Sequence, residues 1–451
     1  MRGDFSRDSF DALGGFTRVL QQQGRIEIDA DGNERQAIQL RLIRQLAADL
    51  IGPFGGPKGT FRLSEADGMT FDFAISPGSY YVDGWRIENV APVYFRGDGK
   101  DRPAQPGFAA AQPKEGSHFV WLDVWERHVS ALEHDSPLRA NDPRRIAEVA
   151  LAGQDTASRA QTVWAVRLSE LSRDDAATLQ QGGDWRVIMD RLQPPGRGLL
   201  AARAIDPAAA GSDDPCLVGP TSAYRGVENQ LYRVEIWREG TAGDGASFVW
   251  SRENGSVLFA VEQVAGKRVR LAEGWHDARF GLGVGDIVSL EGSAQRHGAA
   301  ASLFKVVQYD DEAIELELDG APALDAAGGE VVLRRWDHRQ RPASAGAGRL
   351  VDGALALVED EWITLEDGIS VRFPPSPENV PSRYRPGDHW LIPARTAIGD
   401  ILWLQKGDEP AAVAPHGIER RFAPLGLIRF DAQGKFTLDL DLRKEFGPLA
   451  G

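Results

Sequence analysis

The stretch that decides the fold reads His118-Phe119-Val120-Trp121-Leu122-Asp123-Val124-Trp125-Glu126-Arg127-His128-Val129. Alternate positions place Val120, Leu122 and Val124 on one face of a strand. The opposite face carries Phe119, Trp121 and Trp125. A strand that is apolar on both faces needs cover on both sides, so the pattern predicts a strand inside a sheet and not at its edge.

A second, shorter run of the same kind spans 162–168, and it suggests a paired neighbour for the first. The chain also has 50 Gly, 26 Pro and 12 Trp in 451 residues, which suits short strands joined by turns better than helices. We therefore expect a mainly β, multi-domain protein built of antiparallel β sandwiches or barrels, with one N-terminal amphipathic helix.

Turn signals divide the chain into domains. Asp83-Gly84 and Asn254-Gly255 are favoured two-residue hairpin turns, and the Pro-, Ala- and Asp-rich stretch 193–215 has the composition of a linker. A short helix is expected from 170 to about 181. The predicted divisions are an arm and docking helix (1–60), a first β-domain (61–193), a central barrel or sandwich (216–340) and a C-terminal β-domain (345–446).

A polar arm over 1–33 leads into the predicted helix, which begins near Asn33 and ends at Gly52-Pro53. Its apolar residues recur every four positions, at Ile38, Leu42, Leu46 and Leu50. The arm is too polar to form a core of its own, so this stripe needs a surface from elsewhere. That surface is either a neighbouring subunit or the chain's own first β-domain, and we favour docking on a partner.

Composition argues against several classes of function. A net charge of −15 disfavours a nucleic-acid partner, because neutralising phosphates requires a basic surface. Cys216 is the only cysteine, so an internal disulfide and a cysteine metal cluster are ruled out. No run of 18 apolar residues predicts a membrane span, and the polar start lacks the apolar core of a signal peptide. We expect assembly in the cytoplasm.

Motifs that suggest cofactor or metal binding fail on inspection. The Gly-rich segment 52–60 lacks a Ser or Thr directly after its Lys, and it follows a helix where a phosphate-binding loop leaves a strand. His118 and His128 lie ten residues apart on one strand, too far to share an ion. In the pairs Asp337-His338 and Asp388-His389, strand neighbours point to opposite faces. We expect no cofactor and no metal.

Carboxylates provide the remaining route to an enzyme. A glycoside hydrolase needs two of them about 5 to 9 Å apart. The candidates are Asp123, Glu126, Glu133, Glu228 and Glu253. The stronger reading is that Asp123 and Glu126 are buried ion-pair partners of Arg127, Arg159 or Arg167. Most tryptophans lie in alternating strands, where they fill cores more often than they stack on sugars.

Several stretches carry a family resemblance. They are Arg2-Gly3-Asp4-Phe5, Gln22-Gln23-Gly24-Arg25, Leu50-Ile51-Gly52-Pro53, Leu122-Asp123-Val124-Trp125-Glu126-Arg127-His128-Val129, Ala150-Leu151-Ala152-Gly153-Gln154-Asp155-Thr156, Trp250-Ser251-Arg252-Glu253-Asn254-Gly255-Ser256-Val257 and Pro415-His416-Gly417-Ile418-Glu419. The chain resembles, along nearly its whole length, an uncharacterised domain family whose members accompany phage-tail-like contractile injection systems. The resemblance implies a location more than a mechanism, and it carries over no catalytic residue.

These observations together lead us to expect a structural component of a contractile particle, at its baseplate, spike or fibre end, and not an enzyme. Subunits near the axis of such a particle inherit its symmetry, so we expect a homotrimer, with a six-copy ring as the alternative. A glycan-binding module that uses exposed Trp on a cell-facing tip is the competing class. A cell-wall glycan hydrolase ranks third.

Overall fold

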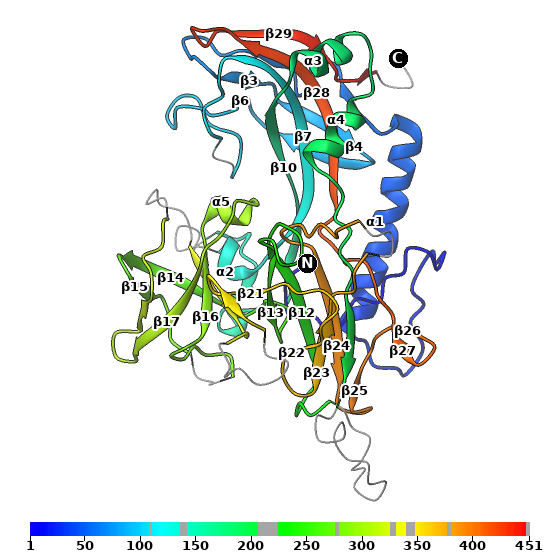
Figure 1. Cartoon of the computed structure of the whole chain (residues 1–451), viewed down its shortest axis with the longest axis vertical. Coiled ribbons are helices and arrows are strands. Elements are labelled where there is room, and N and C mark those ends of the chain that lie inside the picture. The colour runs from blue at the N-terminus through cyan, green and yellow to red at the C-terminus, as the bar shows by residue number, and fades with distance from the viewer. Residues whose placement is uncertain are drawn as a thin grey trace, which may run out of the picture.

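The computed structural model describes residues 1–107, 110–135, 142–205, 224–275, 279–324, 331–339, 348–376 and 380–447. Antiparallel sheets make up most of the regular structure, and one long helix stands near the N-terminus (Figure 1). The predicted mainly β fold is therefore confirmed. None of the helices in these ranges is long and apolar enough to cross a membrane.

The predicted interior strand is β7 (Gly116–Val129). It lies between β10 (Arg159–Glu170) and β28 (Arg420–Phe430), and β29 (Phe436–Asp441) forms the far edge of the sheet. All of these pairs are antiparallel. The two runs that the sequence singled out are thus direct neighbours, and β7 is interior as predicted.

The two faces of β7 are covered by different parts of the chain. The sheet of β7 belongs to the part of the molecule drawn at the top of Figure 1, which we call the upper body. Val120, Leu122 and Val124 are fully buried in the main core of this body. The opposite face packs on two short helices, α3 (Arg173–Gln180) and α4 (Trp185–Leu192). The predicted helix at 170–181 corresponds to α3, whereas α4 was not expected.

A second sheet of this body has the order β30-β1-β4-β5. Its strands are β1 (Phe54–Pro57), β4 (Gly78–Val82), β5 (Trp85–Asn89) and β30 (Glu445–Phe446). Three short strands form a small sheet beside it: β2 (Leu63–Glu65), β3 (Phe73–Ile75) and β6 (Val93–Tyr94). Asp83 and Gly84, with φ values of 47° and 77°, join β4 to β5 as the predicted hairpin turn.

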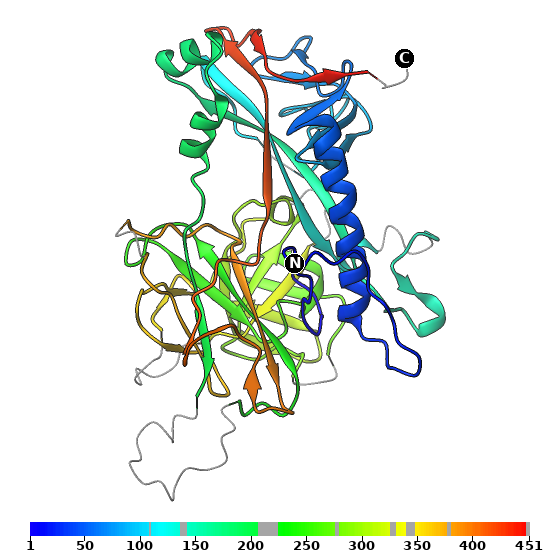
Figure 2. The ribbon, with the colours of Figure 1, turned by 90° about the vertical axis from the view of Figure 1, so that its right-hand side faces the viewer.

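The long helix α1 (Asp29–Ile51) runs along the side of the molecule and contacts β1 and β4 (Figure 2). It begins four residues before Asn33, where Asp29 and Asp31 place negative charge in the first turn and complement the helix dipole. It ends at Gly52, whose φ of 91° suits glycine.

The lower body contains a six-stranded sheet of order β20-β21-β13-β12-β24-β25 and a three-stranded sheet β11-β23-β22. Their large buried side chains, such as Tyr232, Trp250 and Trp390, form one core. The strands are β11 (Ala201–Ala204), β12 (Gln230–Arg238), β13 (Ser247–Ser251), β20 (Leu350–Val351), β21 (Ala354–Ala356), β22 (Ile363–Thr364), β23 (Ile369–Arg372), β24 (His389–Arg395) and β25 (Asp400–Ile401).

Beside this sheet stands a closed barrel of order β14-β15-β18-β17-β16-β19. Its strands are β14 (Leu258–Ala265), β15 (Arg268–Leu271), β16 (Ile287–Glu291), β17 (Leu303–Asp310), β18 (Glu315–Leu318) and β19 (Val332–Trp336). The remaining short elements are α2 (Ala131–His134), α5 (Ser293–Arg296), β8 (Ala147–Glu148), β9 (Gln154–Asp155), β26 (Gln405–Lys406) and β27 (Glu409–Pro410).

At Asn254-Gly255 the predicted turn is present, but the predicted pairing of the two flanking strands is wrong. Both residues have positive φ, 50° and 66°, so the tight turn exists. The strands on either side do not pair, because β13 lies between β12 and β21 while β14 joins the barrel. The turn instead carries the chain from the six-stranded sheet into the barrel.

The strands of 345–446 also depart from the predicted separate C-terminal domain. β20 to β25 complete the two sheets of the lower body, whereas β28 and β29 return to β7 and β30 pairs with β1. In the described part of the chain, β26–β27 is the only sheet whose strands all come from this segment. The edge of β7 is closed by β28, some 300 residues later in the chain, a pairing that local patterns do not reveal. Within the predicted linker 193–215, residues 201–204 form β11. Residues 206–223, which include the end of this linker and Cys216, lie outside the described residues.

Candidate functional site

The start of the arm is inserted where the six-stranded sheet meets the barrel. The Asn254 side-chain amide donates to the carbonyl oxygens of Met1 (3.1 Å) and Gly3 (2.8 Å). The Gly3 amide in turn donates to the Asn254 carbonyl oxygen (3.3 Å). The turn between sheet and barrel is therefore also the receptor for the N-terminal segment.

Arg2 joins the six-stranded sheet to the barrel through buried ion pairs. It contacts Glu235 on β12 (2.5 Å) and Glu291 on β16 (2.9 Å). Arg233 also pairs with Glu235 (2.5 Å), and Arg334 on β19 pairs with Glu291 (2.9 Å). Three guanidinium groups thus share two carboxylates whose side chains are 4% and 6% exposed. We call these five residues the Arg2 cluster.

The charges of the cluster set the pKa of Glu291. Burial by itself raises the pKa of this carboxyl group, but Arg334 and Arg2 outweigh that effect and lower it to about 2. Glu235, equally buried, is held below its ordinary pKa by Arg2 and Arg233 in the same way. Both carboxylates are therefore ionised and neutralised, as a structural role requires and a general acid does not permit.

Sequence reasoning missed this cluster. The signal was present in β12, where Arg233 and Glu235 stand on the same face of an otherwise apolar strand. Two opposite charges at alternate positions of a buried strand predict a polar junction on that face. Their third partner, Arg2, lies more than 200 residues away.

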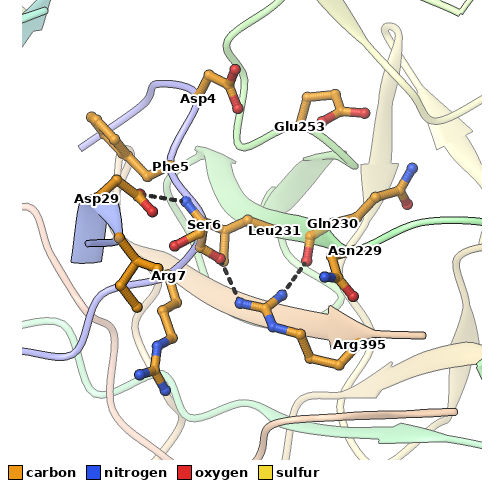
Figure 3. Close-up of a pocket in the computed structure, with 11 residues that line it drawn as sticks. Asp4, Phe5, Ser6, Arg7, Asp29, Asn229, Gln230, Leu231, Glu253 and Arg395 are labelled. Carbon is orange, nitrogen blue, oxygen red and sulfur yellow. Dashed lines mark hydrogen bonds between the residues drawn. The ribbon is translucent and has the colours of Figure 1, made fainter. Parts of the chain in front are cut away.

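A cavity of about 650 Å³ lies between the arm and the ends of β12 and β24 (Figure 3). Arg395 forms part of its wall and donates to the carbonyl oxygens of Ser6 (2.7 Å) and Gln230 (3.3 Å). Asp29, at the start of α1, accepts from the Ser6 amide (2.8 Å). These bonds fix the arm against the sheet, so the cavity results from how the arm docks.

Each of the predicted carboxylates lies against an arginine. Asp123 contacts Arg167 (3.3 Å) and Arg420 (2.6 Å), so the expected ion pair with Arg167 is present. Glu126 pairs with Arg44 of α1 (2.5 Å), and not with the arginines that we expected.

The other three candidates are also bound to basic or capping groups. Glu133 accepts from the Ser130 amide (2.9 Å) in a capping box and lies 3.8 Å from Arg127. Glu228 and Glu253 both contact Arg279, which makes them the only candidates of the five that the structure brings to a shared partner. Each of the five carboxylates thus has at least one arginine contact.

Two of the histidines that the sequence singled out lie against backbone carbonyl oxygens. His338 has its Nε2 2.6 Å from the carbonyl oxygen of Gly353, and burial lowers its pKa to about 4. Asp337 lies 3.2 Å from Arg335 instead. His118 contacts the carbonyl oxygen of Lys114 (2.9 Å). Within the described ranges, no group of three or more His, Cys, Asp and Glu side chains is placed to hold a metal.

The four apolar residues predicted to form one docking stripe on α1 differ in their exposure to solvent. Ile38 is 3% exposed and belongs to the buried side of α1. Leu42, Leu46 and Leu50 are 47%, 60% and 66% exposed, and Ile43 beside them is 64% exposed. We call these four exposed residues the α1 patch. The prediction of one four-residue docking stripe is therefore corrected at Ile38, which packs within its own chain.

A polar contact fixes which face of α1 is buried. The Arg44 guanidinium stacks on the ring of Trp85 at 3.6 Å from the ring centre, and it also pairs with Glu126 of β7. A Cβ atom added at Gly84 would overlap the Arg44 carbonyl oxygen, so the helix backbone lies directly on the β4–β5 turn. With this face docked, the α1 patch on the opposite face is left in solvent.

The tryptophans of this chain are buried or half-buried. All 12 lie within the described ranges, seven of them buried and five half-buried. Trp362, one of the half-buried ones, has Arg203 at 3.8 Å and Arg372 at 4.9 Å from its ring centre. The competing glycan-binding prediction depended on exposed Trp, and it loses that support.

Comparison with known proteins assigns the chain to a protein family. One family model matches residues 1–185 and 197–437, and its description is a family of unknown function, DUF6519. The chain belongs to this family. Because the match includes the arm, α1, both bodies and β28, the Arg2 cluster and the α1 patch both lie within the DUF6519 region. No curated protein and no solved structure matches the chain.

Proposed function

We propose that the chain is a structural subunit of a contractile, phage-tail-like particle, at its baseplate, spike or fibre end. The observation that carries the proposal is the α1 patch, an apolar surface left in solvent on a well-anchored helix. The proposal that the particle is contractile and phage-tail-like rests on the sequence resemblance described above. The arginine contacts of Asp123, Glu126 and Glu133 favour a structural role for these three carboxylates.

The α1 patch has the composition and placement of an interface element. Contiguous exposed apolar side chains on a soluble protein mark interaction sites more often than single ones do. Covering each of the four side chains supplies on the order of 1.5 to 3 kcal/mol. The backbone beneath them is already ordered by the opposite face of α1, so little ordering entropy opposes binding.

Within the particle we propose a homotrimer, with a six-copy ring as the alternative. Closed cyclic symmetry is the usual solution for identical subunits around an axis. Light scattering on the purified chain measures its mass in solution, and cryo-electron microscopy of the particle counts its copies.

The test compares two triple variants of α1. Leu42→Ser, Leu46→Ser and Leu50→Ser together remove most of the α1 patch. Gln36→Ser, Gln39→Ser and Gln45→Ser change three exposed polar residues of the same helix and serve as the matched control. Both chains are expected to melt like the natural protein, because none of these side chains is buried.

Particles purified from cells that make each variant are then analysed by quantitative mass spectrometry. We expect the leucine variant to drop out of the particles at least tenfold and the glutamine variant to remain. Equal incorporation of both variants would contradict the proposed role of the α1 patch. Absence of the natural chain from the particles would overturn the proposed function itself.

A further inference from the structure

The arm continues past its docked start into a loop that stands out from the body. Residues 11–28 are all exposed except Val19, and the side chains of Leu13 and Ile26 are 94% and 89% exposed. Figures 1 and 2 both show this loop projecting beside the lower end of α1. Long loops without secondary structure are uncommon and usually functional. Its exposed apolar side chains indicate that another surface covers it.

The end of this loop has the pattern of a strand that lacks a sheet. Arg25-Ile26-Glu27-Ile28 alternates charged and apolar side chains. Ile28 has φ −118° and ψ 154°, which is extended backbone. Within the described part of the chain, no strand pairs with this segment.

The chain also has an open strand edge, on β10. The Val166 amide donates to Gln105 Oε1 (2.6 Å), and Gln105 Nε2 donates to the Val166 carbonyl oxygen (3.0 Å). The Gln105 side chain thus takes the place of a neighbouring strand at this point. Because hydrogen-bonding direction alternates along a strand, the peptide groups of Trp164, Thr162 and Ala160 also face outward, away from β7.

The lower half of that edge is bare. Arg159, Ala160 and Gln161 are exposed. Among the described residues, none forms a backbone hydrogen bond with the outward groups of Ala160 or Thr162. The Arg159 guanidinium reaches only the carbonyl oxygens of Ala157 and Ser158, at 3.4 and 3.1 Å, so it meets no carboxylate in this part of the structure. Open edges of this kind accept added strands.

We propose that residues 24–28 of one copy add to this edge of β10 in a second copy as an antiparallel strand. In the register that places Ile26 opposite Ala160, Glu27 lies opposite Arg159. The other residues on the isoleucine face then meet small side chains, because Gly24 lies opposite Thr162 and Ile28 opposite Ser158. The contact thus combines one pair of opposite charges, Glu27 and Arg159, with small side chains opposite Gly24 and Ile28.

The same geometry explains why the acceptor belongs to another copy. The arm is tied to its own α1 on either side of Asp8, by the Ser6–Asp29 bond (2.8 Å) and the Ser9–Glu34 bond (2.7 Å). Its projecting loop leaves the β10 edge of the same chain bare. Donor and acceptor are different surfaces, so repeated addition is head-to-tail, and it gives a ring where the rotation between copies closes. The inference rests on the homo-oligomer in the proposed function and identifies its contact.

Proline at position 162 tests the acceptor edge. Thr162→Pro removes an outward N–H without removing any donor to β7, and edge strands tolerate proline at such positions. Thr162→Ala keeps the N–H and is the control. We expect the natural chain and Thr162→Ala to form the same oligomer by light scattering, and Thr162→Pro to be monomeric with an unchanged circular dichroism spectrum. An oligomer that survives Thr162→Pro, or a natural chain that is monomeric, overturns the inference.

A cysteine pair identifies the donor segment. In a Cys216→Ser background, Glu27→Cys and Arg159→Cys place two thiols at directly opposite positions of the proposed pair. Oxidation is expected to link separate chains into covalent oligomers on a non-reducing gel, whereas either single variant gives at most dimers. A disulfide within one chain, or none at all, overturns the inference. Loss of the oligomer in the α1 patch variant alone would leave the proposed function standing and this contact refuted.

Discussion

At the scale of single residues, Arg2 holds the junction between β12 and β16. Its guanidinium neutralises Glu235 and Glu291 together, and breaking a buried ion pair leaves desolvated charge behind. Arg2→Ala is expected to lower the free energy of unfolding by about 3 kcal/mol in urea titrations. Arg18→Ala, in the exposed loop of the same arm, is the control and should change it by less than about 0.5 kcal/mol. Equal effects would refute the role of the Arg2 cluster.

Glu291 in the same cluster makes the stability depend on pH. Its pKa is about 2 in the folded chain against an ordinary value of 4.5. Because the folded value is the lower one, the stabilising contribution is complete above pH 4.5 and is lost as the pH falls towards 2. The loss for this group amounts to about 3 kcal/mol. Melting curves of Glu291→Gln should fall less steeply over this pH range than those of the natural chain; parallel curves would contradict the assignment.

At the scale of elements, α1 is held by one face and offers the other. Ile38→Ala opens a cavity on the buried face and is expected to cost about 2 to 4 kcal/mol of unfolding free energy. Leu46→Ala, on the α1 patch, should cost less than about 0.5 kcal/mol. Thermal melting of the two variants, matched for change in size, measures the difference. A larger loss at Leu46 would mean that the faces are assigned the wrong way round.

The β4–β5 turn beneath α1 gives an independent test of the same contact. Gly84 has a φ of 77°, and an added Cβ atom would overlap the Arg44 carbonyl oxygen. Gly84→Ala is therefore expected to lower the melting temperature markedly, since strain at such positions costs on the order of 1 to 3 kcal/mol. Gly99→Ala also has positive φ (70°) but meets open space, so it separates backbone strain from the clash. If both variants melt alike, α1 does not lie on this turn.

These elements also show what the sequence could predict. The alternation over 118–129 identified an interior strand, and Asp83-Gly84 identified a hairpin, because both signals are local. The partners of Asn254-Gly255 and of 420–430 depend on which edges are free in the folded sheet, and composition carries no such information. The four-residue spacing of the α1 leucines predicted a stripe. It did not reveal that Arg44 and Trp85 would bury the face beside it.

At the scale of the whole molecule, the arm takes part in folding as well as in docking. Deleting residues 1–51 removes Arg2 from its cluster and separates Arg44 from Glu126, so the deletion is expected to lower the melting temperature even in the isolated chain. The deletion therefore cannot distinguish the two roles left open by the sequence, and the surface variants of α1 can. A truncated chain that melts like the natural one would show that the arm contributes nothing to stability.

The central claim is that the α1 patch is covered by another subunit in an assembled particle. Cryo-electron microscopy of contractile particles isolated from cells that make this chain tests it most directly. We predict density for three copies, or six, around the particle axis, with Leu42, Leu46 and Leu50 packed against a neighbour. Particles without this chain, or with the outer face of α1 in open solvent, would contradict the account.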